Sequence, residues 1–466
     1  MSHVLPPPSG FMVGDWGKNL AWSLAGQCAP ILAAVVAIPI LIRALGTDRF
    51  GMLALAWTLV GYFNLFDLGL GRALTQVIAE KREKNTQEIA DLVWTTMAFT
   101  FGLGGVAALL LCLIAPWLVY RVLQIPDGLR LEALQGLRLL ALCIPIVMSA
   151  SALRGVLEAH ARFRETNALR ILTGLLIFCG PMGVLPFSTR LLPVMAVLVV
   201  TRILDGAAHL FLCARTVAPP HGMALRGMAL RGMGLWRAHR VLPLLRLGGW
   251  MTISNVISPL MVYLDRFLIG ALISTTAVAY YAVPYDMVAH MGTIPAALVV
   301  LLFPAFSTRY KEDPAQMRLL FGQGVRYTAL SLLPLMLIAI ALADAGLRWW
   351  VGAEFAVQGT RVLQWLALGR FVNGLAQIPF AFLQGIGRPD ITAKLHLAEL
   401  PLYAALVWTL TARYGIEGTA MAWGARVAVD AALLFMMSRR LFEVASRRGG
   451  DGPGPDCPQG RANPLR

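Results

Sequence analysis

Charged residues are scarce in this chain of 466 residues. Asp, Glu, Lys and Arg make up 14% of it and hydrophobic residues 58%, whereas soluble domains carry about 25% charged residues. A soluble protein of this length would need several domains with polar surfaces, and the chain has too few charges to cover them. The composition therefore argues against an ordinary soluble enzyme and predicts a membrane protein.

Long uncharged stretches take the place of polar surfaces. Runs without any charge cover 19–42, 92–120, 171–189 and 267–285, and about 20 apolar residues suffice to span a bilayer. We therefore predict an all-α polytopic membrane protein with about twelve transmembrane helices. The predicted spans are 20–42, 50–72, 92–119, 137–157, 169–187, 191–214, 247–271, 278–306, 325–343, 362–384, 395–411 and 417–437.

Motifs for disulfide, metal or catalytic chemistry are missing as well. The six cysteines are far apart without a CxxC pair, and the seven histidines show no HExxH spacing. The first apolar run is too long for a cleavable signal peptide. We see no catalytic constellation, and we expect neither a metal nor an organic cofactor.

The basic residues predict the orientation of the chain. With both termini in the cytoplasm, the inside segments hold 24 Lys and Arg and the outside segments hold 9, in agreement with the positive-inside rule. This asymmetry accounts for the net charge of +15 without nucleic acid. The predicted division is a cytoplasmic N-terminus (1–19), an N-lobe of helices 1–6 (20–214), a basic cytoplasmic linker (215–246), a C-lobe of helices 7–12 (247–437) and a cytoplasmic, largely disordered tail (438–466).

The linker contains a tandem repeat, GMALR-GMALR, at 222–231. Six basic residues and no acid lie between 215 and 246, so we expect this segment to contact anionic lipid head groups. A site for a specific partner is the alternative.

The two halves of the chain resemble each other. At an offset of 224 residues, helices 6 and 12 share Arg202 with Arg426 and Phe211 with Phe435. Six spans per half give both lobes the same orientation, related by a pseudo-two-fold axis along the membrane normal. This arrangement predicts a transporter that rocks about a site near the middle of the membrane.

Charges inside the spans mark the candidate site, because each costs a few kcal/mol at the bilayer centre. Arg170, Arg326 and Glu399 lie near cytoplasmic ends and can snorkel, so we set them aside. The candidates for substrate binding are Arg266, Arg72, Arg202, Arg370 and Arg426. The candidates for ion coupling or pairing are Asp67, Asp265, Asp286, Asp205 and Asp430.

Spacing separates these candidates. Arg202 with Asp205, and Arg426 with Asp430, can pair within their own helices. Adjacent residues on a helix cannot face each other, so Asp265 or Arg266 must reach another helix or a cavity. Arg266 is therefore the strongest single candidate.

Several stretches, taken in order, resemble a known family. They are IRALGTDRFGMLAL (42–55), FDLGLGRALTQVIAEK (66–81), GVLEAHARF (155–163), YLDRFLIGAL (263–272), LQGIGRPDITAKL (383–395) and ARYGIEGTAMAW (412–423). Together they are similar to polysaccharide transporters, the O-antigen-type flippases of the multidrug/oligosaccharidyl-lipid/polysaccharide (MOP) export superfamily. The resemblance implies a fold like that of the MATE transporters.

It also implies a function. Such a protein moves undecaprenyl-diphosphate-linked oligosaccharides to the outer leaflet of the bacterial cytoplasmic membrane, for O-antigen, capsule or exopolysaccharide synthesis, without catalysing a reaction. Membrane lipids, and possible polymerase and chain-length machinery, would be its partners. Because the sequence has no P-loop, the energy would come from an H⁺ or Na⁺ gradient, the membrane potential or downstream polymerisation.

Two alternatives remain open at this point. In a MATE-type drug/cation antiporter, Asp67 and Asp286 would hold the cation. A membrane enzyme of polysaccharide assembly would need a catalytic loop, for which the short outside connections leave little room.

Depth in the membrane assigns roles to two arginines. Arg266 is expected in the outer half of the bilayer and Arg72 nearer the cytoplasm, so the two could bind a diphosphate in different conformations. The planar guanidinium suits phosphate oxygens. The alternative is that Arg266 only pairs with an acid on a neighbouring helix.

Overall fold

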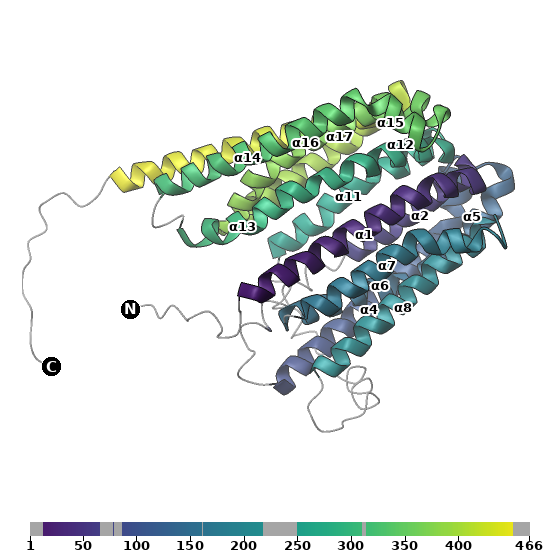
Figure 1. Ribbon diagram of the computed structural model, residues 1–466, viewed down its shortest axis with the longest axis horizontal. Coiled ribbons are helices and arrows are strands. Elements are labelled where there is room, and N and C mark those ends of the chain that lie inside the picture. The colour runs from purple at the N-terminus through teal and green to yellow at the C-terminus, as the bar shows by residue number, and fades with distance from the viewer. Residues whose placement is uncertain are drawn as a thin grey trace, which may run out of the picture.

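A computed structural model describes residues 13–65, 78, 86–160, 162–217, 249–309 and 314–450 (Figure 1). These residues contain helices and no strand, as predicted. Within them, nine stretches are long and apolar enough to cross a membrane. The first group of helices is α1 (Val13–Leu45), α2 (Thr47–Leu65), α4 (Thr86–Trp117), α5 (Arg130–Ala141), α6 (Ile144–Ala159), α7 (Phe163–Val184) and α8 (Leu191–Val217). The second is α11 (Gly249–Leu272), α12 (Thr275–Ala289), α13 (Thr293–Arg309), α14 (Pro314–Ala341), α15 (Ala343–Trp350), α16 (Ala353–Gly385) and α17 (Pro389–Gly450).

Two predicted spans are broken helices. The span expected at 137–157 belongs to a longer stretch in which α5 ends and α6 begins with Pro145 in its first turn. The span expected at 278–306 is divided into α12 and α13 by a 3-10 turn, His290–Gly292. Proline lacks an N–H donor and fits the first turn of a helix, so Pro145 and Pro295 suit these restarts.

The last two predicted spans form a tight hairpin within α17. Gly415 has φ 63° and ψ −145°, which interrupts the helix. The hydroxyls of Thr411 and Thr419 lie 2.7 Å apart across the turn, and a Cβ at Gly418 would collide with the carbonyl oxygen of Leu410. The second half continues to Gly450, past the expected end at 437. The count of twelve helices stays a prediction.

The two groups of helices, called here the N-lobe (α1–α8) and the C-lobe (α11–α17), share one apolar core. Its buried members include Leu53 of the N-lobe and Tyr281 of the C-lobe. Smaller clusters lie within single lobes, among them one around Val156 and one around Phe382. The ribbons of the lobes accordingly converge at one end, and spread apart toward the end where α1 begins and α17 finishes (Figure 1).

The converging end is closed by backbone contact between the lobes. A Cβ at Gly51 would collide with the carbonyl oxygen of Thr275, so the first turns of α2 and α12 meet where only glycine fits. Thr276 donates a hydrogen bond to Asp48 beside this contact. In the orientation predicted from the basic residues, these turns would face the outside.

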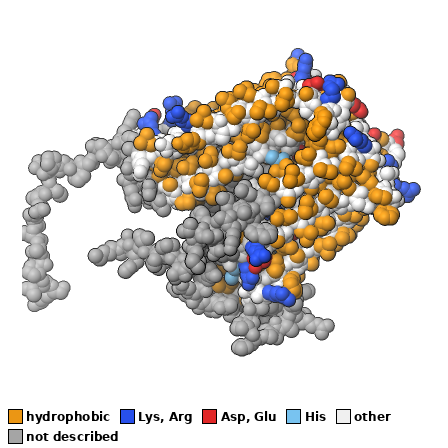
Figure 2. Space-filling view, viewed as in Figure 1, with side chains coloured by type: hydrophobic (Ala, Val, Ile, Leu, Met, Phe, Trp, Pro, Cys, Tyr) orange, Lys and Arg blue, Asp and Glu red, His pale blue; other side chains and the backbone are white. Residues whose placement is uncertain are grey.

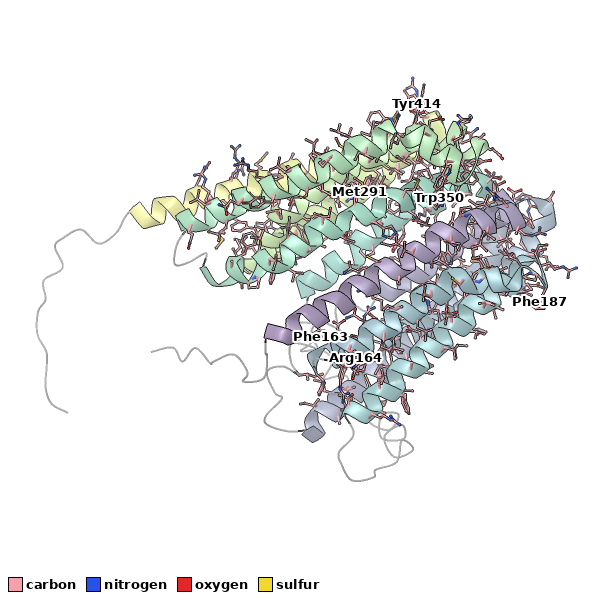
Figure 3. All side chains as sticks on the ribbon, in the orientation of Figure 1. Phe163, Arg164, Phe187, Met291, Trp350 and Tyr414 are labelled. Carbon is pink, nitrogen blue, oxygen red and sulfur yellow. The ribbon has the colours of Figure 1, made fainter. Side chains whose placement is uncertain are left out.

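Apolar side chains cover most of the described part of the face shown in Figure 2, as a lipid-facing surface requires. Examples of exposed large residues are Leu32, Leu109, Leu113, Val300, Leu301 and Leu330. Phe187 and Trp350 lie toward the converging end, whereas Phe163 and Arg164 lie toward the other (Figure 3). Aromatic and basic residues commonly mark membrane interfaces.

Candidate functional site between the lobes

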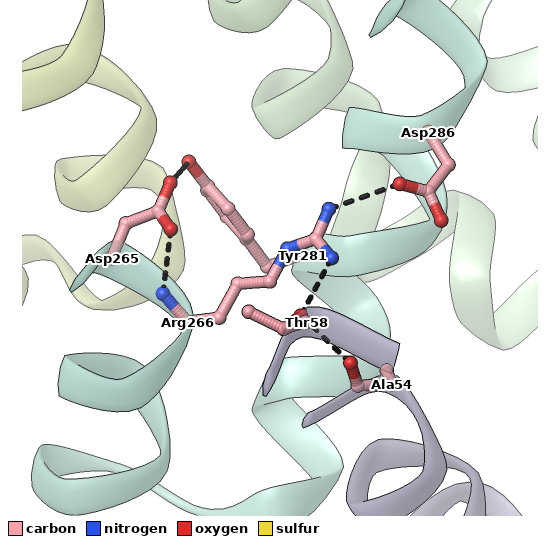
Figure 4. Close-up of polar contacts among 6 residues, drawn as sticks. All are labelled: Ala54, Thr58, Asp265, Arg266, Tyr281 and Asp286. Atoms are coloured by element: carbon pink, nitrogen blue, oxygen red, sulfur yellow. Dashed lines mark hydrogen bonds and ion pairs between the residues drawn. The ribbon is translucent and has the colours of Figure 1, made fainter. Parts of the chain in front are cut away.

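Arg266 of α11 links the two lobes. Its Nη1 donates to the hydroxyl of Thr58 on α2 at 2.8 Å, and its Nη2 donates to Oδ1 of Asp286 on α12 at 2.9 Å (Figure 4). The Thr58 hydroxyl in turn donates to the carbonyl of Ala54 at 2.7 Å. The Thr58 hydroxyl thus accepts from the guanidinium while its own O–H is directed to the Ala54 carbonyl.

Asp265 points to a different partner. One of its carboxylate oxygens accepts a hydrogen bond from the Tyr281 hydroxyl at 2.6 Å, and the other accepts from the backbone N–H of Arg266 at 2.7 Å. The neighbouring side chains thus diverge, as their adjacency on α11 requires. Asp265 is fully buried, so these two donors replace the water that a carboxylate needs.

The guanidinium of Arg266 is buried, with only 6% of the residue exposed. The ring of Tyr285 lies 4.7 Å from it, in cation–π geometry. Asp286 is its one ion-pair partner within the described chain, and the side chain of Asp286 is 36% exposed. The acid can therefore be hydrated when the pair opens, whereas the arginine needs another anion or acceptor.

Arg370 and Arg426 lie at a cavity of about 270 Å³ inside the C-lobe. Nη2 of Arg370 donates to the carbonyl of Ala289 at 2.7 Å, where α12 ends. A Cβ at Gly292 would collide with this guanidinium. Arg370 thus stabilises the break between α12 and α13 and also lines the cavity.

Neither pair that the spacing within a helix allows forms an ion pair among the described residues. Nη1 of Arg426 lies 3.6 Å from Oε2 of Glu399, and no ion pair with Asp430 is found among the described residues. Asp205 accepts from the Thr173 hydroxyl at 2.8 Å and lies 3.4 Å from Nδ1 of His209, rather than pairing with Arg202. Arg426 thus finds its partner on the first half of α17, whereas Asp205 keeps a partner on its own helix, four residues on.

Sequence reasoning also misplaced Glu399. It was set aside as a residue that snorkels, but only 5% of it is exposed and α17 carries it beside Arg426. Thr58, Tyr281 and Tyr285 were not among the site candidates, because uncharged polar residues are common within spans. Tyr281 and Tyr285 are four residues apart and share one face of α12, which is a signal that the sequence does carry.

Two of the sequence candidates cannot be placed. Asp67 and Arg72 lie outside the described residues. In the part of the chain that the structure describes, no group of three or more His, Cys, Asp or Glu residues could hold a metal ion.

An all-helical membrane protein of two lobes, with buried charges where the lobes meet, has the architecture of a transporter. A family model described as polysaccharide biosynthesis protein matches residues 16–309. The chain is 30% identical over 428 residues to a protein of Shigella flexneri that is provisionally described as an O-antigen transporter. The match covers 92% of this chain and 98% of the relative. The chain therefore belongs to the polysaccharide biosynthesis protein family.

Solved structures agree in fold. A multidrug resistance MATE family transporter in its inward-facing conformation matches with a TM-score of 0.75 and 13% identity, covering 90% of this chain and 96% of that one. The lipid II flippase MurJ in an inward closed conformation matches with a TM-score of 0.68 and 12% identity, covering 92% and 90%. The predicted fold class is confirmed.

Proposed function

We propose that the protein is a flippase for undecaprenyl-diphosphate-linked oligosaccharide repeat units. It would carry them from the inner to the outer leaflet of the bacterial cytoplasmic membrane by alternating access, with both termini in the cytoplasm and without a chemical reaction. A polymerase and chain-length machinery would use the flipped units. Membership of the polysaccharide family and the O-antigen transporter relative support this choice.

One observation carries the proposal: Arg266 joins a C-lobe acid to an N-lobe hydroxyl at the junction of the lobes. A diphosphate has the acceptor oxygens that would replace Asp286 and Thr58, and its charge would leave the guanidinium paired. Arg266 can therefore exchange an internal partner for the substrate as the lobes rearrange.

The closure of the lobes at one end is consistent with the first half of an alternating-access cycle, in which substrate enters. The lobes are sealed between the first turns of α2 and α12, the end that the basic residues assign to the outside. This conformation would receive substrate from the cytoplasmic side. Outward movement of a head group with two negative charges could draw roughly 4–5 kcal/mol from a potential of about 100 mV, negative inside.

The proposal is tested by deleting the gene and locating the lipid-linked repeat units. We expect them to accumulate in the inner leaflet, with surface polysaccharide lost and then restored by the intact gene. Normal surface polysaccharide with reduced drug or dye efflux would instead identify an antiporter and overturn the proposal.

A further inference from the structure

The C-lobe cavity is lined by two kinds of side chain. Amide, charged and hydroxyl groups come from one face of α16, from the second half of α17 and from α11, while aromatic rings come from α12, α16 and α17. The polar members are Ser258, Arg370, Asn373, Gln377, Arg426 and Asp430, and the rings belong to Tyr285, Phe380, His396 and Trp423.

Carboxyl groups lie beside one of the two arginines at this cavity. Arg426 has Glu399 at 3.6 Å, and Asp430, one helical turn from Arg426, lines the cavity. A ligand with two negative charges would meet two buried carboxylates here, and like charges repel strongly in a medium of low dielectric constant. The cavity therefore suits an uncharged polar ligand better than a diphosphate.

Some residues that line the cavity also carry buried polar atoms that have no hydrogen-bond partner within the described chain. They are Nε1 of Trp423, Nε of Arg370, Nε of Arg426 and Oδ1 of Asp430. Buried polar atoms usually have a partner. A hydroxyl group both donates and accepts, so a ligand rich in hydroxyls would serve both kinds of atom after small side-chain movements.

The cavity adjoins the Arg266 site through one ring. Tyr285 lies 4.7 Å from the Arg266 guanidinium and 6.2 Å, between ring centroids, from Trp423. In a diphosphate-linked glycan the first sugar is bonded directly to the diphosphate. A sugar site next to a diphosphate site is the arrangement that such a molecule requires.

We propose that the C-lobe cavity binds a sugar unit of the lipid-linked glycan while Arg266 holds the diphosphate. The inference rests on the proposed function and names the part of the substrate that this cavity takes. The volume of about 270 Å³ lies just below the range of about 300–1,000 Å³ typical of small-molecule pockets. It fits a monosaccharide unit rather than a whole repeat unit, with the aromatic rings against its C–H faces.

The test is protection of a single cysteine in the cavity. Ser258→Cys is placed in the full chain, with the native cysteines replaced, and labelled with a small polar thiol reagent. The probes are free repeat-unit oligosaccharide, released by mild acid from the lipid-linked pool of the same bacterium, and inorganic diphosphate. Thr189→Cys, on the exposed connection between α7 and α8, is the control.

We expect the oligosaccharide to slow labelling of Ser258→Cys but not of Thr189→Cys, and diphosphate to protect neither. Adding Gln377→Ala should raise the half-protecting concentration about tenfold, the equivalent of one lost hydrogen bond. Protection by diphosphate alone, or by neither probe, would overturn the inference. So would failure of both Ser258→Cys and Asn373→Cys to label.

These outcomes are separate from failure of the proposed function. If deletion of the gene traps lipid-linked units in the inner leaflet but the oligosaccharide protects nothing, only the sugar site is refuted. If deletion leaves those units normally distributed, the flippase itself is refuted, whatever the cavity binds.

Discussion

Trp350 donates its indole N–H to the backbone carbonyl of Val35 across the two lobes, at 2.7 Å. The acceptor is free because of the sequence of α1. In a regular helix the Val35 carbonyl would accept from residue 39, which is Pro39 and has no N–H. A proline in the N-lobe thus creates a binding point for a tryptophan of the C-lobe.

Removing this donor should weaken the closed end. Trp350→Phe leaves the Val35 carbonyl unpaired, which costs about 1 kcal/mol at a partly exposed site, a factor of about five in the conformational equilibrium. We expect a cysteine at buried Thr275 to react about five times faster with an impermeant thiol reagent added outside.

Trp349→Phe is the matched control, since that neighbouring side chain is 85% exposed. It should leave the rate unchanged. Equal rates in the two variants would show that the indole hydrogen bond does not hold the lobes together.

Substitution of Arg266 should separate ligand binding from structural pairing. Arg266→Lys keeps the charge but loses the planar fork, and Arg266→Ala loses both. We expect normal amounts of protein in the membrane, with export of surface polysaccharide reduced in the Lys variant and abolished in the Ala variant.

The acid partner supplies the control. In the double variant Arg266→Ala, Asp286→Asn, the unpaired carboxylate is removed as well, so export should stay abolished. Restored export in the double variant, or normal export by Arg266→Ala alone, would mean that Arg266 does not bind substrate.

Arg426 should contribute mainly to stability. Arg426→Gln leaves Glu399 and Asp430 buried near each other without a cation, and loss of one partner of a buried pair costs about 3–5 kcal/mol. We expect a markedly lower melting temperature for the purified protein, partly restored by adding Glu399→Gln.

Arg361→Gln provides the comparison. The Arg361 side chain is 78% exposed and lies 3.7 Å from Glu417, so its loss should cost less than about 1 kcal/mol. Similar melting temperatures for the two variants would refute a stabilising role of the Arg426 pair.

The orientation can be checked with two single cysteines in a chain without the native ones. Cysteine at Gly128, between η1 (Leu118–Val122) and α5, should react from outside the cell. Cysteine at Gly227, in the basic linker, should react only after the membrane is made permeable. Reaction of both from outside would reverse the assignment of the linker.

The sequence was sufficient to predict the class of fold, because long uncharged runs are rare outside membrane-spanning helices. It also indicated that Asp265 and Arg266 must diverge, since that follows from helix geometry alone. The partners themselves could not be predicted. Thr58 lies 208 residues from Arg266 in the chain, and only the packing of α2 against α11 brings the two together.

Burial was equally hard to predict. Glu399 lies near the end of a predicted span, where a carboxylate normally reaches water. The hairpin at Gly415 brings the second half of α17 back alongside the first, so that Arg426 lies beside Glu399. A sequence pattern gives the face of a helix on which a residue lies, but not what covers that face.

The apolar core shared by the lobes influences which conformation the protein adopts in the absence of substrate. Opening the outer end would separate Leu53 and its N-lobe neighbours from the C-lobe side chains of that core, at a cost of about 25 cal/mol for each Å² of apolar surface exposed to water. Without cargo, nothing offsets this penalty. We therefore expect the empty protein to rest with this end shut, which in the proposed orientation leaves it ready to receive substrate from the cytoplasmic side.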